Sequence, residues 1–217
     1  MSRPQPPLRG LYAITSAGLC ADRARLLAAV EGALRGGAAL IQFRDKQGAP
    51  AARLASARAL AVLCHDHGAR LIINDDVALA LDCGADGVHL GAADAPLAQA
   101  RRALGARAIL GASCGPYLER AHAAIAAGAD YVAFGRFFPS RTKPDAPQAT
   151  VELLLQARGE LQLPICAIGG VTPDNGGALI AAGADMIAAV EGVFGEAEPA
   201  AVEIAARAYS RLFDPPK

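Results

Sequence analysis

Short apolar segments alternate with longer segments of helical periodicity along almost the whole chain, and each kind occurs eight times. The apolar segments are residues 11–15, 39–43, 70–74, 87–90, 108–111, 131–135, 165–168 and 186–190. The helical segments lie near residues 21–36, 49–67, 77–82, 95–104, 117–127, 147–158, 174–182 and 199–212. Strands that are apolar along their whole length are typical of a parallel sheet covered by helices. The alternation therefore predicts an α/β fold, a (β/α)8 TIM barrel.

An internal repeat supports this count. The triplet Gly-Ala-Asp precedes three of the predicted strands, at residues 84–86, 128–130 and 183–185. Glycine is common at the end of a helix, so each triplet fits a helix-to-strand connection. An open doubly wound sheet is the alternative, but the glycine-rich phosphate loop expected after its first strand is missing. No linker divides the sequence, so we expect one barrel domain over residues 1–217, with residues 1–10 as a flexible N-terminal extension.

The composition argues against several classes of partner. The 21 basic and 21 acidic residues balance, and no basic stripe indicates nucleic-acid binding. No segment approaches the ~18 apolar residues of a membrane span, and the N-terminus has no signal-peptide core. The cysteines are scattered without a CxxC pair, which favours reduced thiols over a disulfide or zinc framework. We therefore expect a cytoplasmic protein without nucleic-acid or membrane partners, and no pattern indicates its oligomeric state.

Polar and glycine residues gather where the predicted strands end. They are Arg44, Asp45 and Lys46; Asn74, Asp75 and Asp76; Asp94; Ser113; the loop 135–147; Gly169 and Gly170; and Glu191. The active sites of barrel enzymes lie at the carboxyl ends of the strands. The sequence therefore predicts that these residues share one rim.

The second predicted strand places three polar side chains on one side. Gln42, Arg44 and Lys46 are spaced by two, so they project in the same direction from an extended chain. An amide with two cations above it suits an anionic or heteroaromatic ligand. Lysine is scarce in this chain, which draws attention to Lys46 and Lys143. In the alternative, the glutamine is satisfied by its barrel neighbours and the two cations are only solvated.

The acidic residues of the rim allow two interpretations. Asp75 and Asp94 follow consecutive strands, and carboxylate oxygens completed by substrate phosphate and water are typical of a Mg²⁺ site. In the alternative, Asp94 is the N-cap of a helix that begins near Ala95. Asp76 precedes the helical segment at 77–82, so we expect it to cap that helix.

Two further segments have phosphate-binding chemistry. Ser140, Thr142 and Lys143 supply two hydroxyls and an ammonium in one loop. Gly169 and Gly170 stand at the end of a strand just before a helix, where backbone N–H groups can approach an anion. The histidines, His65, His67, His89 and His122, show no metal-ligand spacing, and we expect structural or surface roles for them. No Gly-x-Ser-x-Gly elbow indicates acyl transfer.

These motifs resemble those of the thiamine phosphate synthase family. The matching segments, in order along nearly the whole chain, are LYAIT, IQFRDK, LIINDDVALAL, GADGVHLG with Asp94, GAS, ADYVAFGRFFPSRTKPDA and AIGGVTPDN. The resemblance implies a (β/α)8 barrel and a Mg²⁺-assisted transferase. Such an enzyme condenses 4-amino-2-methyl-5-(diphosphooxymethyl)pyrimidine with 4-methyl-5-(2-phosphooxyethyl)thiazole, and it releases thiamine phosphate and pyrophosphate.

The resemblance also implies roles for individual residues. The pyrimidine diphosphate would be held by Gln42, Phe43, Arg44, Asp45, Lys46, Asn74, Ser113 and Lys143. The thiazole phosphate would be held by Ser140, Arg141, Thr142, Gly170, Val190 and Glu191. Asp75 and Asp94 would bind Mg²⁺, while Arg44, Lys46 and Lys143 would act on the departing pyrophosphate. No protein nucleophile is implied, in agreement with the absence of one among the motifs.

Three positions depart from the family pattern. Ala92 stands where a Gln is frequent, Gly115 where many members have His, and Glu191 where a Ser is usual. An acid at position 191 would repel phosphate unless its side chain turned outward. The alternatives are a thiazole tautomerase-like paralogue, a Schiff-base aldolase that uses Lys46 or Lys143, and a non-catalytic barrel that binds thiamine phosphates. The combination of RDK, the two acids and PSRTK favours the synthase.

Overall fold

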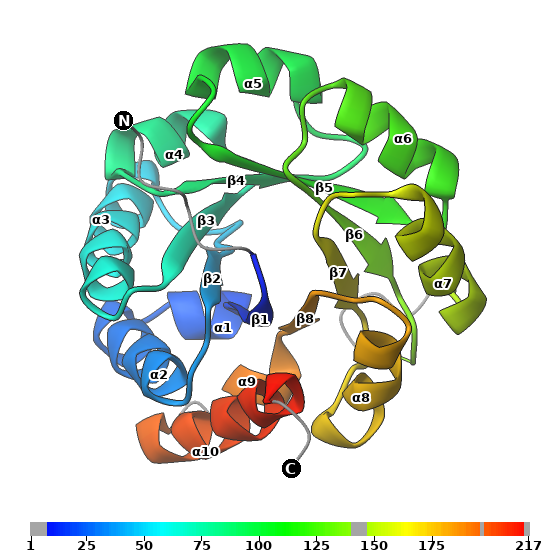
Figure 1. Ribbon diagram of the computed structural model, residues 1–217. Coiled ribbons are helices and arrows are strands. Elements are labelled where there is room, and N and C mark those ends of the chain that lie inside the picture. Colours follow the sequence, from blue (N-terminus) through cyan, green and yellow to red (C-terminus); the bar gives the residue numbers. More distant parts are fainter. Residues whose placement is uncertain (1–7, 140–146, 196–197, 215–217) are drawn as a thin grey trace.

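The computed structural model describes residues 8–139, 147–195 and 198–214, and it forms a closed barrel of eight parallel strands (Figure 1). The strands are β1 (Gly10–Ile14), β2 (Leu40–Phe43), β3 (Arg70–Asn74), β4 (Gly87–Leu90), β5 (Ile109–Gly115), β6 (Tyr131–Gly135), β7 (Ile165–Ile168) and β8 (Met186–Ala189). Each strand pairs with the next in the sequence, and β8 pairs with β1 to close the barrel. The predicted (β/α)8 TIM barrel is confirmed.

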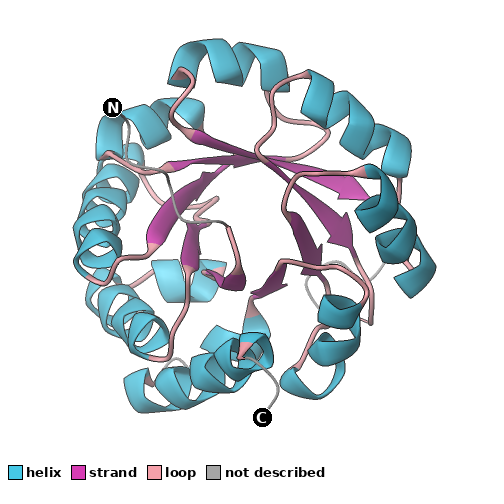
Figure 2. Cartoon of the chain, in the orientation of Figure 1, coloured by secondary structure: helices cyan, strands magenta, loops and turns pink. Residues whose placement is uncertain are grey.

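The helices form a ring outside the strands (Figure 2). They are α1 (Ala17–Cys20), α2 (Arg23–Arg35), α3 (Pro50–Asp66), α4 (Val77–Cys83), α5 (Leu97–Leu104), α6 (Leu118–Ala126), α7 (Val151–Glu160), α8 (Pro173–Ala181), α9 (Glu191–Phe194) and α10 (Pro199–Ser210), followed by the 3₁₀ turn η1 (Arg211–Phe213). The periodicity predicted all of these except the two four-residue helices α1 and α9 and the turn η1. Segments this short do not show a helical repeat.

Alternation along each strand divides the apolar side chains between two cores. In β2, Leu40 and Gln42 face the barrel interior, whereas Ile41 and Phe43 pack against the helices. The interior core also contains Tyr12, Ile14, Ile72, Ile109, Tyr131, Ala133, Cys166, Met186 and Ala188. This period of two decides which residues of each strand can reach a ligand in the barrel mouth.

The Gly-Ala-Asp repeat is a clamp at the amino-terminal end of the barrel. The Asp185 carboxylate accepts the backbone N–H of Ile165 at 2.8 Å and an N–H of Arg158, which also donates to the carbonyl of Gly183. Asp130 does the same for Leu110 and Arg101, and Asp86 accepts the N–H of Leu71 and is hydrogen-bonded to His65 at the end of α3. Each aspartate thereby ties the end of one helix to the first residues of a neighbouring strand.

Removing one clamp is expected to lower stability without affecting the other end of the barrel. Asp185→Ala leaves the N–H of Ile165 without its acceptor and the Arg158 guanidinium without its carboxylate partner, so the free energy of unfolding should fall by about 2 kcal/mol. Urea denaturation measures this loss. Asp82→Ala, at an exposed position of α4, is the matched control. An unchanged midpoint in the Asp185 variant would contradict the role of the clamp.

The N-terminal end of the described chain is part of the barrel. Gly10 begins β1, and Leu8 packs against the interior core, so residues 8–10 of the expected N-terminal extension belong to the barrel. All five cysteines, Cys20, Cys64, Cys83, Cys114 and Cys166, are free. Within the described ranges, no helix combines the length and the apolar character needed to cross a bilayer.

Candidate active site

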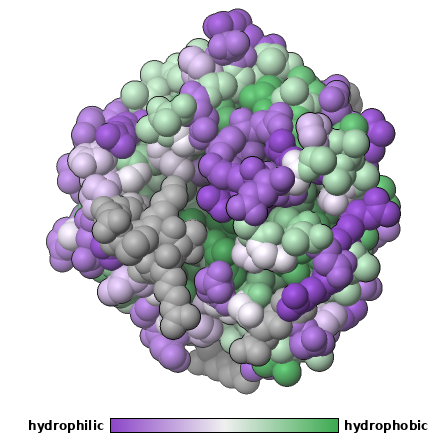
Figure 3. Space-filling model, turned by 180° about the vertical axis from the view of Figure 1, so that it is seen from behind, coloured by the Kyte–Doolittle hydropathy of each residue, from purple (hydrophilic) through white to green (hydrophobic). Residues whose placement is uncertain are grey.

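A cavity of about 650 Å³ opens at the carboxyl ends of the strands. Seen from behind, the molecule is hollowed near the centre of this face, with apolar residues at the bottom of the hollow and polar residues beside it (Figure 3). Of the predicted site residues, the cavity is lined by Gln42, Arg44, Asn74, Ser113, Gly170, Val190 and Glu191. A second cavity of about 480 Å³ is lined by Asp45, Lys46 and Asn74–Val77, so Asn74 contributes to both.

Asp75, Asp94 and Lys46 form a charged cluster at the second cavity. Lys46 Nζ lies 3.0 Å from Asp75 Oδ2, and the carboxyl groups of Asp75 and Asp94 lie close enough to shift each other's pKa. Among the described residues, Asp75 alone has a positive φ without being glycine, at 64°. That left-handed turn is uncommon for an L-residue, and backbone strain of this kind concentrates at functional sites. The sequence prediction that Asp75 and Asp94 converge is therefore matched by their positions.

The two carboxyl groups titrate differently. Burial raises the pKa of Asp75, but the hydrogen bonds from Asp94 and Lys46 outweigh it and bring the pKa below its ordinary value. The pKa of Asp94 is raised, first by burial and then by the hydrogen bond to the Asp75 carboxylate. Two like charges this close are unfavourable, and their repulsion adds to the rise in the pKa of Asp94.

Of the two aspartates considered as helix N-caps, Asp94 does not cap a helix and Asp76 does. Asp94 does not cap α5, because that helix begins at Leu97 after Pro96 and has no side-chain cap. Its Oδ2 instead accepts the backbone N–H of Gly91 at 2.7 Å, which holds the carboxyl in the β4–α5 loop. Asp76 is the N-cap of α4, as predicted, and accepts the N–H of Leu79 at 2.9 Å.

The cluster has the donor chemistry of a magnesium site. Among the described residues, no group of three or more His, Cys, Asp or Glu side chains could hold a metal. Asp75 and Asp94 would thus supply two hard oxygen ligands and leave the others to phosphate and water, as Mg²⁺ prefers. A divalent cation bound there would also relieve the repulsion between the carboxylates.

The residues that follow β2 divide between the two cavities. Arg44 lines the larger cavity, and its backbone N–H donates to Thr15 Oγ1 at 2.9 Å. Asp45 and Lys46 line the smaller one, where Asp45 Oδ1 accepts two N–H groups of its own loop. Phe43, implied as a substrate contact, is 2% exposed and packs in the outer core, so its side chain faces away from both cavities.

The opposite wall of the larger cavity is built from β7, β8 and their loops. Gly170 has φ 65°, and a Cβ there would stand 2.3 Å from the carbonyl oxygen of Pro139, so only glycine fits. Tyr209 of α10 donates its hydroxyl to the carbonyl of Val171 at 2.8 Å and fixes this wall from behind. Glu191 is exposed at the first turn of α9.

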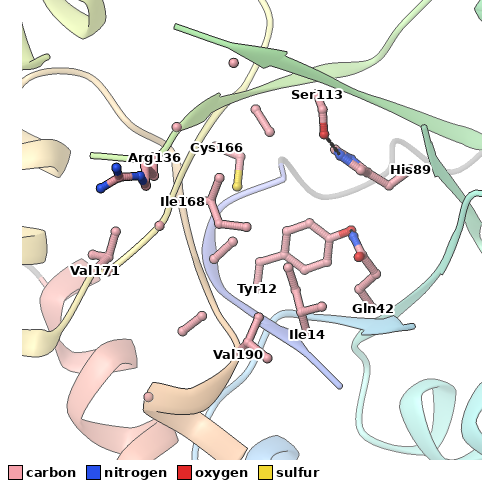
Figure 4. A pocket seen from close by; sticks show the side chains of 18 of the residues that line it. Tyr12, Ile14, Gln42, His89, Ser113, Arg136, Cys166, Ile168, Val171 and Val190 are labelled. Atoms are coloured by element: carbon pink, nitrogen blue, oxygen red, sulfur yellow. Dashed lines mark hydrogen bonds between the residues drawn. The ribbon is translucent and has the colours of Figure 1, made fainter. Parts of the chain in front are cut away.

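A hydrogen-bonded chain of side chains was missed by the sequence analysis. It runs beneath the larger cavity through Gln42, Tyr12, Tyr131, His89 and Ser113, part of which is visible in Figure 4. Alternation places Tyr12 and His89 inside the barrel, and that was the available signal. The structural role expected for His89 is thus incomplete, because this side chain also lines the cavity.

Other cations of the rim also escaped the sequence analysis. Arg136 and Arg120 line the larger cavity, and the Arg120 guanidinium lies 4.3 Å from the centre of the Tyr117 ring, two residues beyond the glycine at position 115. Arg53 lines the smaller cavity and donates to Asp76. The predicted phosphate-binding residues Ser140, Arg141, Thr142 and Lys143 lie outside the described residues.

Comparisons of the sequence agree with this geometry. A family model described as thiamine monophosphate synthase matches residues 11–193. A thiamine-phosphate synthase from Thioalkalivibrio sulfidiphilus is 53% identical over 207 residues, which cover 95% of this chain and 96% of the relative.

Comparisons of the fold lead in the same direction. The structure of a thiamine phosphate pyrophosphorylase from Pyrococcus furiosus is 32% identical and has a TM-score of 0.82, covering 94% of this chain and 97% of that chain. A solved structure called "Native KDPGal structure" has a TM-score of 0.73 over 98% of this chain and 96% of that chain. At 18% identity it supports the barrel fold alone.

Proposed function

The chain belongs to the thiamine monophosphate synthase family and is a transferase of that type, and from this premise we propose its substrates and the roles of its residues. The substrates are 4-amino-2-methyl-5-(diphosphooxymethyl)pyrimidine and 4-methyl-5-(2-phosphooxyethyl)thiazole, and the products are thiamine phosphate and pyrophosphate. The observation that carries the proposal is the cluster of Asp75, Asp94 and Lys46 directly beside a cavity sized for two small heterocycles.

The pyrimidine ring occupies the deep part of the larger cavity, where the amide of Gln42 and the hydroxyl of Ser113 offer polar contacts. Its diphosphate extends past Asn74, which lines both cavities, toward Lys46 in the smaller one. This placement separates an apolar, ring-binding chamber from a charged one. Such a division suits a ligand with a heterocycle at one end and a diphosphate at the other.

Asp75 and Asp94 would hold Mg²⁺ through their carboxylate oxygens. When bound, the ion supplies positive charge that favours departure of pyrophosphate. Arg44 and Lys46 add positive charge from the loop after β2, and Lys143 adds more from the sequence after β6. These cations stabilise the leaving group more strongly as its charge grows, which is the condition for accelerating the reaction.

The bond changes need no protein nucleophile. The carbon–oxygen bond between the exocyclic methylene and the diphosphate breaks, and its electron pair leaves with pyrophosphate. The amino group of the pyrimidine stabilises the resulting cation, and the thiazole nitrogen donates its lone pair to form the new carbon–nitrogen bond. The protein holds the two rings together and excludes water from the cation, so positioning supplies much of the rate.

The thiazole phosphate is held by the wall that Gly170, Val190 and Glu191 form, together with Ser140, Arg141 and Thr142. At Gly170 no Cβ stands in the way, so its backbone can approach an anion closely. The side chain of Glu191 extends along its own helix toward Gly195: its Oε2 is 3.9 Å from the position that a Cβ on Gly195 would occupy. The acid at position 191 is therefore compatible with a phosphate bound by backbone groups.

Replacing Glu191 by the residue usual in the family tests this arrangement. Glu191→Ser removes a negative charge near the phosphate, so the KM for the thiazole phosphate should fall by about twofold, within the range of exposed charge pairs. Steady-state kinetics at saturating pyrimidine diphosphate measure the change. Glu198→Ser, at the start of α10 and outside both cavities, is the charge-matched control. A large increase in KM would show that Glu191 assists binding.

One assay tests the function as a whole. Purified protein, both substrates and MgCl₂ are mixed, and thiamine phosphate and pyrophosphate are measured. We expect both products in equal amounts, and no reaction with EDTA. Isomerisation of a thiazole without metal would favour the tautomerase-like alternative, and borohydride trapping of a carbonyl substrate would favour the aldolase. Tight binding of thiamine phosphate without turnover would identify a non-catalytic barrel.

The cellular location is a separate proposal. The five cysteines lie singly among the described residues, and four of them are buried. Such thiols are compatible with a reducing compartment, so we place the protein in the cytoplasm. Fractionation with an antibody against the native chain tests the location.

A further inference from the structure

We infer that His89 is a positioning residue that fixes Ser113 as a hydrogen-bond donor toward the pyrimidine ring. This inference rests on the proposed function and goes beyond it, because it assigns a direction to the hydrogen bonds of the cavity floor. It follows from five side chains that cross the barrel interior, one each from β1, β2, β4, β5 and β6. They are linked by four hydrogen bonds of 2.7–2.9 Å between Gln42, Tyr12, Tyr131, His89 and Ser113.

The direction of the chain is set at the Gln42 end. Gln42 Nε2 donates to the Tyr12 hydroxyl at 2.7 Å. Tyr12 is 1% exposed, and its one other hydrogen-bond partner among the described residues is the Tyr131 hydroxyl, at 2.9 Å. A buried hydroxyl hydrogen without an acceptor is costly. The Tyr12 hydroxyl therefore donates to Tyr131.

The same reasoning extends to the histidine. Burial raises the pKa of both Tyr12 and Tyr131, so each phenol keeps its proton. The Tyr131 oxygen accepts from Tyr12, which leaves its own hydrogen for His89 Nδ1, 2.8 Å away. Nδ1 is then an acceptor, and a neutral imidazole carries its proton on Nε2. His89 Nε2 lies 2.8 Å from Ser113 Oγ and donates to it.

The opposite arrangements leave one hydrogen unpaired. If His89 carried its proton on Nδ1, or on both nitrogens, Tyr131 would accept from it and would have to donate to Tyr12. The Tyr12 oxygen would then accept from both Gln42 and Tyr131, and its own buried hydrogen would point at no acceptor. With Gln42 Nε2 as the donor to Tyr12, only one direction satisfies every group in the chain.

The interior is shaped to hold this chain rigidly. Tyr131 is fully buried, and a Cβ on Gly111 would stand 2.1 Å from its Cζ, so the glycine makes room for the ring. The His89 ring is stacked on the Tyr131 ring with 5.5 Å between centroids, and Tyr12 meets Tyr131 edge-on at 6.0 Å. Packed aromatic rings of this kind cannot turn freely, so the hydroxyl directions persist.

The consequence appears at Ser113, which lines the cavity and is the one member of the chain that is not buried. Figure 4 shows His89 and Ser113 joined at one side of the pocket, with Tyr12 and Gln42 at its base. Because Ser113 Oγ accepts from His89, its own hydrogen is directed elsewhere, into the cavity. A hydroxyl that donates into the cavity can hydrogen-bond to an unprotonated ring nitrogen of an aminopyrimidine. It cannot do so to a C–H or an N–H at the same position of the ring.

The tautomer of His89 can be observed without any ligand. In a long-range ¹H–¹⁵N correlation spectrum of the labelled protein, we expect an unprotonated Nδ1 and a protonated Nε2 for His89 at neutral pH. The spectrum of His89→Gln assigns the signal among the four histidines. A proton on Nδ1, or on both nitrogens, overturns the inference, and this result requires neither turnover nor a variant that folds perfectly.

Binding of an unreactive probe tests the role of Ser113. The probe is 4-amino-5-hydroxymethyl-2-methylpyrimidine, which has no leaving group, compared with its two pyridine analogues in which one ring nitrogen is C–H. By calorimetry, one analogue should bind the wild type about tenfold more weakly, as expected for one net hydrogen bond. Ser113→Ala should bind the probe and that analogue equally. A preference that survives in Ser113→Ala overturns the inference.

A second variant separates positioning from packing. Tyr131→Phe keeps the ring but removes the hydrogen that His89 Nδ1 accepts, so we expect the His89 signal to lose its single tautomer and the tenfold preference to shrink. His89→Gln, whose amide N–H can still donate to Ser113, should retain part of the preference. If Tyr131→Phe changes stability but neither the tautomer nor the preference, the chain is structural alone. None of these measurements depends on product formation, so they remain decisive if the proposed reaction fails.

Discussion

Replacing Asp75 with Asn is expected to reduce Mg²⁺-dependent formation of thiamine phosphate by about a thousandfold while the barrel stays folded. Asn keeps the size of the side chain and its ability to adopt the left-handed turn at φ 64°. It removes the charge that balances the metal and leaves Asp94 as the single carboxylate of the pair. Turnover at saturating substrates, measured across a Mg²⁺ titration, separates lost metal affinity from lost chemistry.

The control must show that the effect comes from the charge of Asp75 and not from the loss of any negative charge on or near α4. Asp82→Asn makes the same chemical change at an exposed position of α4 outside both cavities, and it should leave turnover unchanged. Thermal unfolding of both variants verifies the fold. Full activity in Asp75→Asn, with an unchanged response to Mg²⁺, would remove Asp75 from the metal site.

The barrel and its strand ends could be predicted because they depend on local patterns. The alternation of short apolar segments with helical segments, together with the Gly-Ala-Asp repeat, predicts strands, helix ends and connections that lie within about thirty residues of each other. Eight such strand–helix units are the number that closes a barrel. The convergence of Asp75 and Asp94 was also predictable, since consecutive parallel strands end side by side. The contact between their carboxyl groups required the left-handed turn at Asp75, which no sequence pattern indicates.

The roles of interior residues were harder to predict, because they depend on partners far apart in the sequence. Tyr12 and Tyr131 are 119 residues apart, and their contact exists only after the barrel closes. His89 looked structural because it has no ligand spacing, and its link to Ser113 is visible only in three dimensions. For Phe43 the sequence motif did not indicate which way the side chain points. The family motif was carried over as a block, whereas strand alternation sends alternate residues of that block to opposite faces.

The geometry of Lys46 leads to a prediction in which binding and catalysis change in opposite directions. Lys46 is 3.0 Å from Asp75 Oδ2, at the position where a divalent cation would compete with it. Lys46→Gln removes this competitor, so Mg²⁺ should bind the substrate-free protein about threefold more tightly; the effect is small because the lysine is about half exposed. The same change removes a cation that stabilises the departing pyrophosphate, so turnover should fall by about a hundredfold.

Calorimetric titration with Mg²⁺ and steady-state kinetics on the same preparation measure the two effects of Lys46→Gln. Lys46→Arg, which keeps the charge, should retain the original Mg²⁺ affinity and much of the turnover. Arg107→Gln makes a comparable charge change at an exposed residue before β5, at the other end of the barrel, and should alter neither quantity. If Lys46 competes with Mg²⁺ for Asp75, removing it cannot weaken Mg²⁺ binding. A loss of Mg²⁺ affinity in Lys46→Gln would therefore show that the ammonium helps to arrange the carboxylates for the metal.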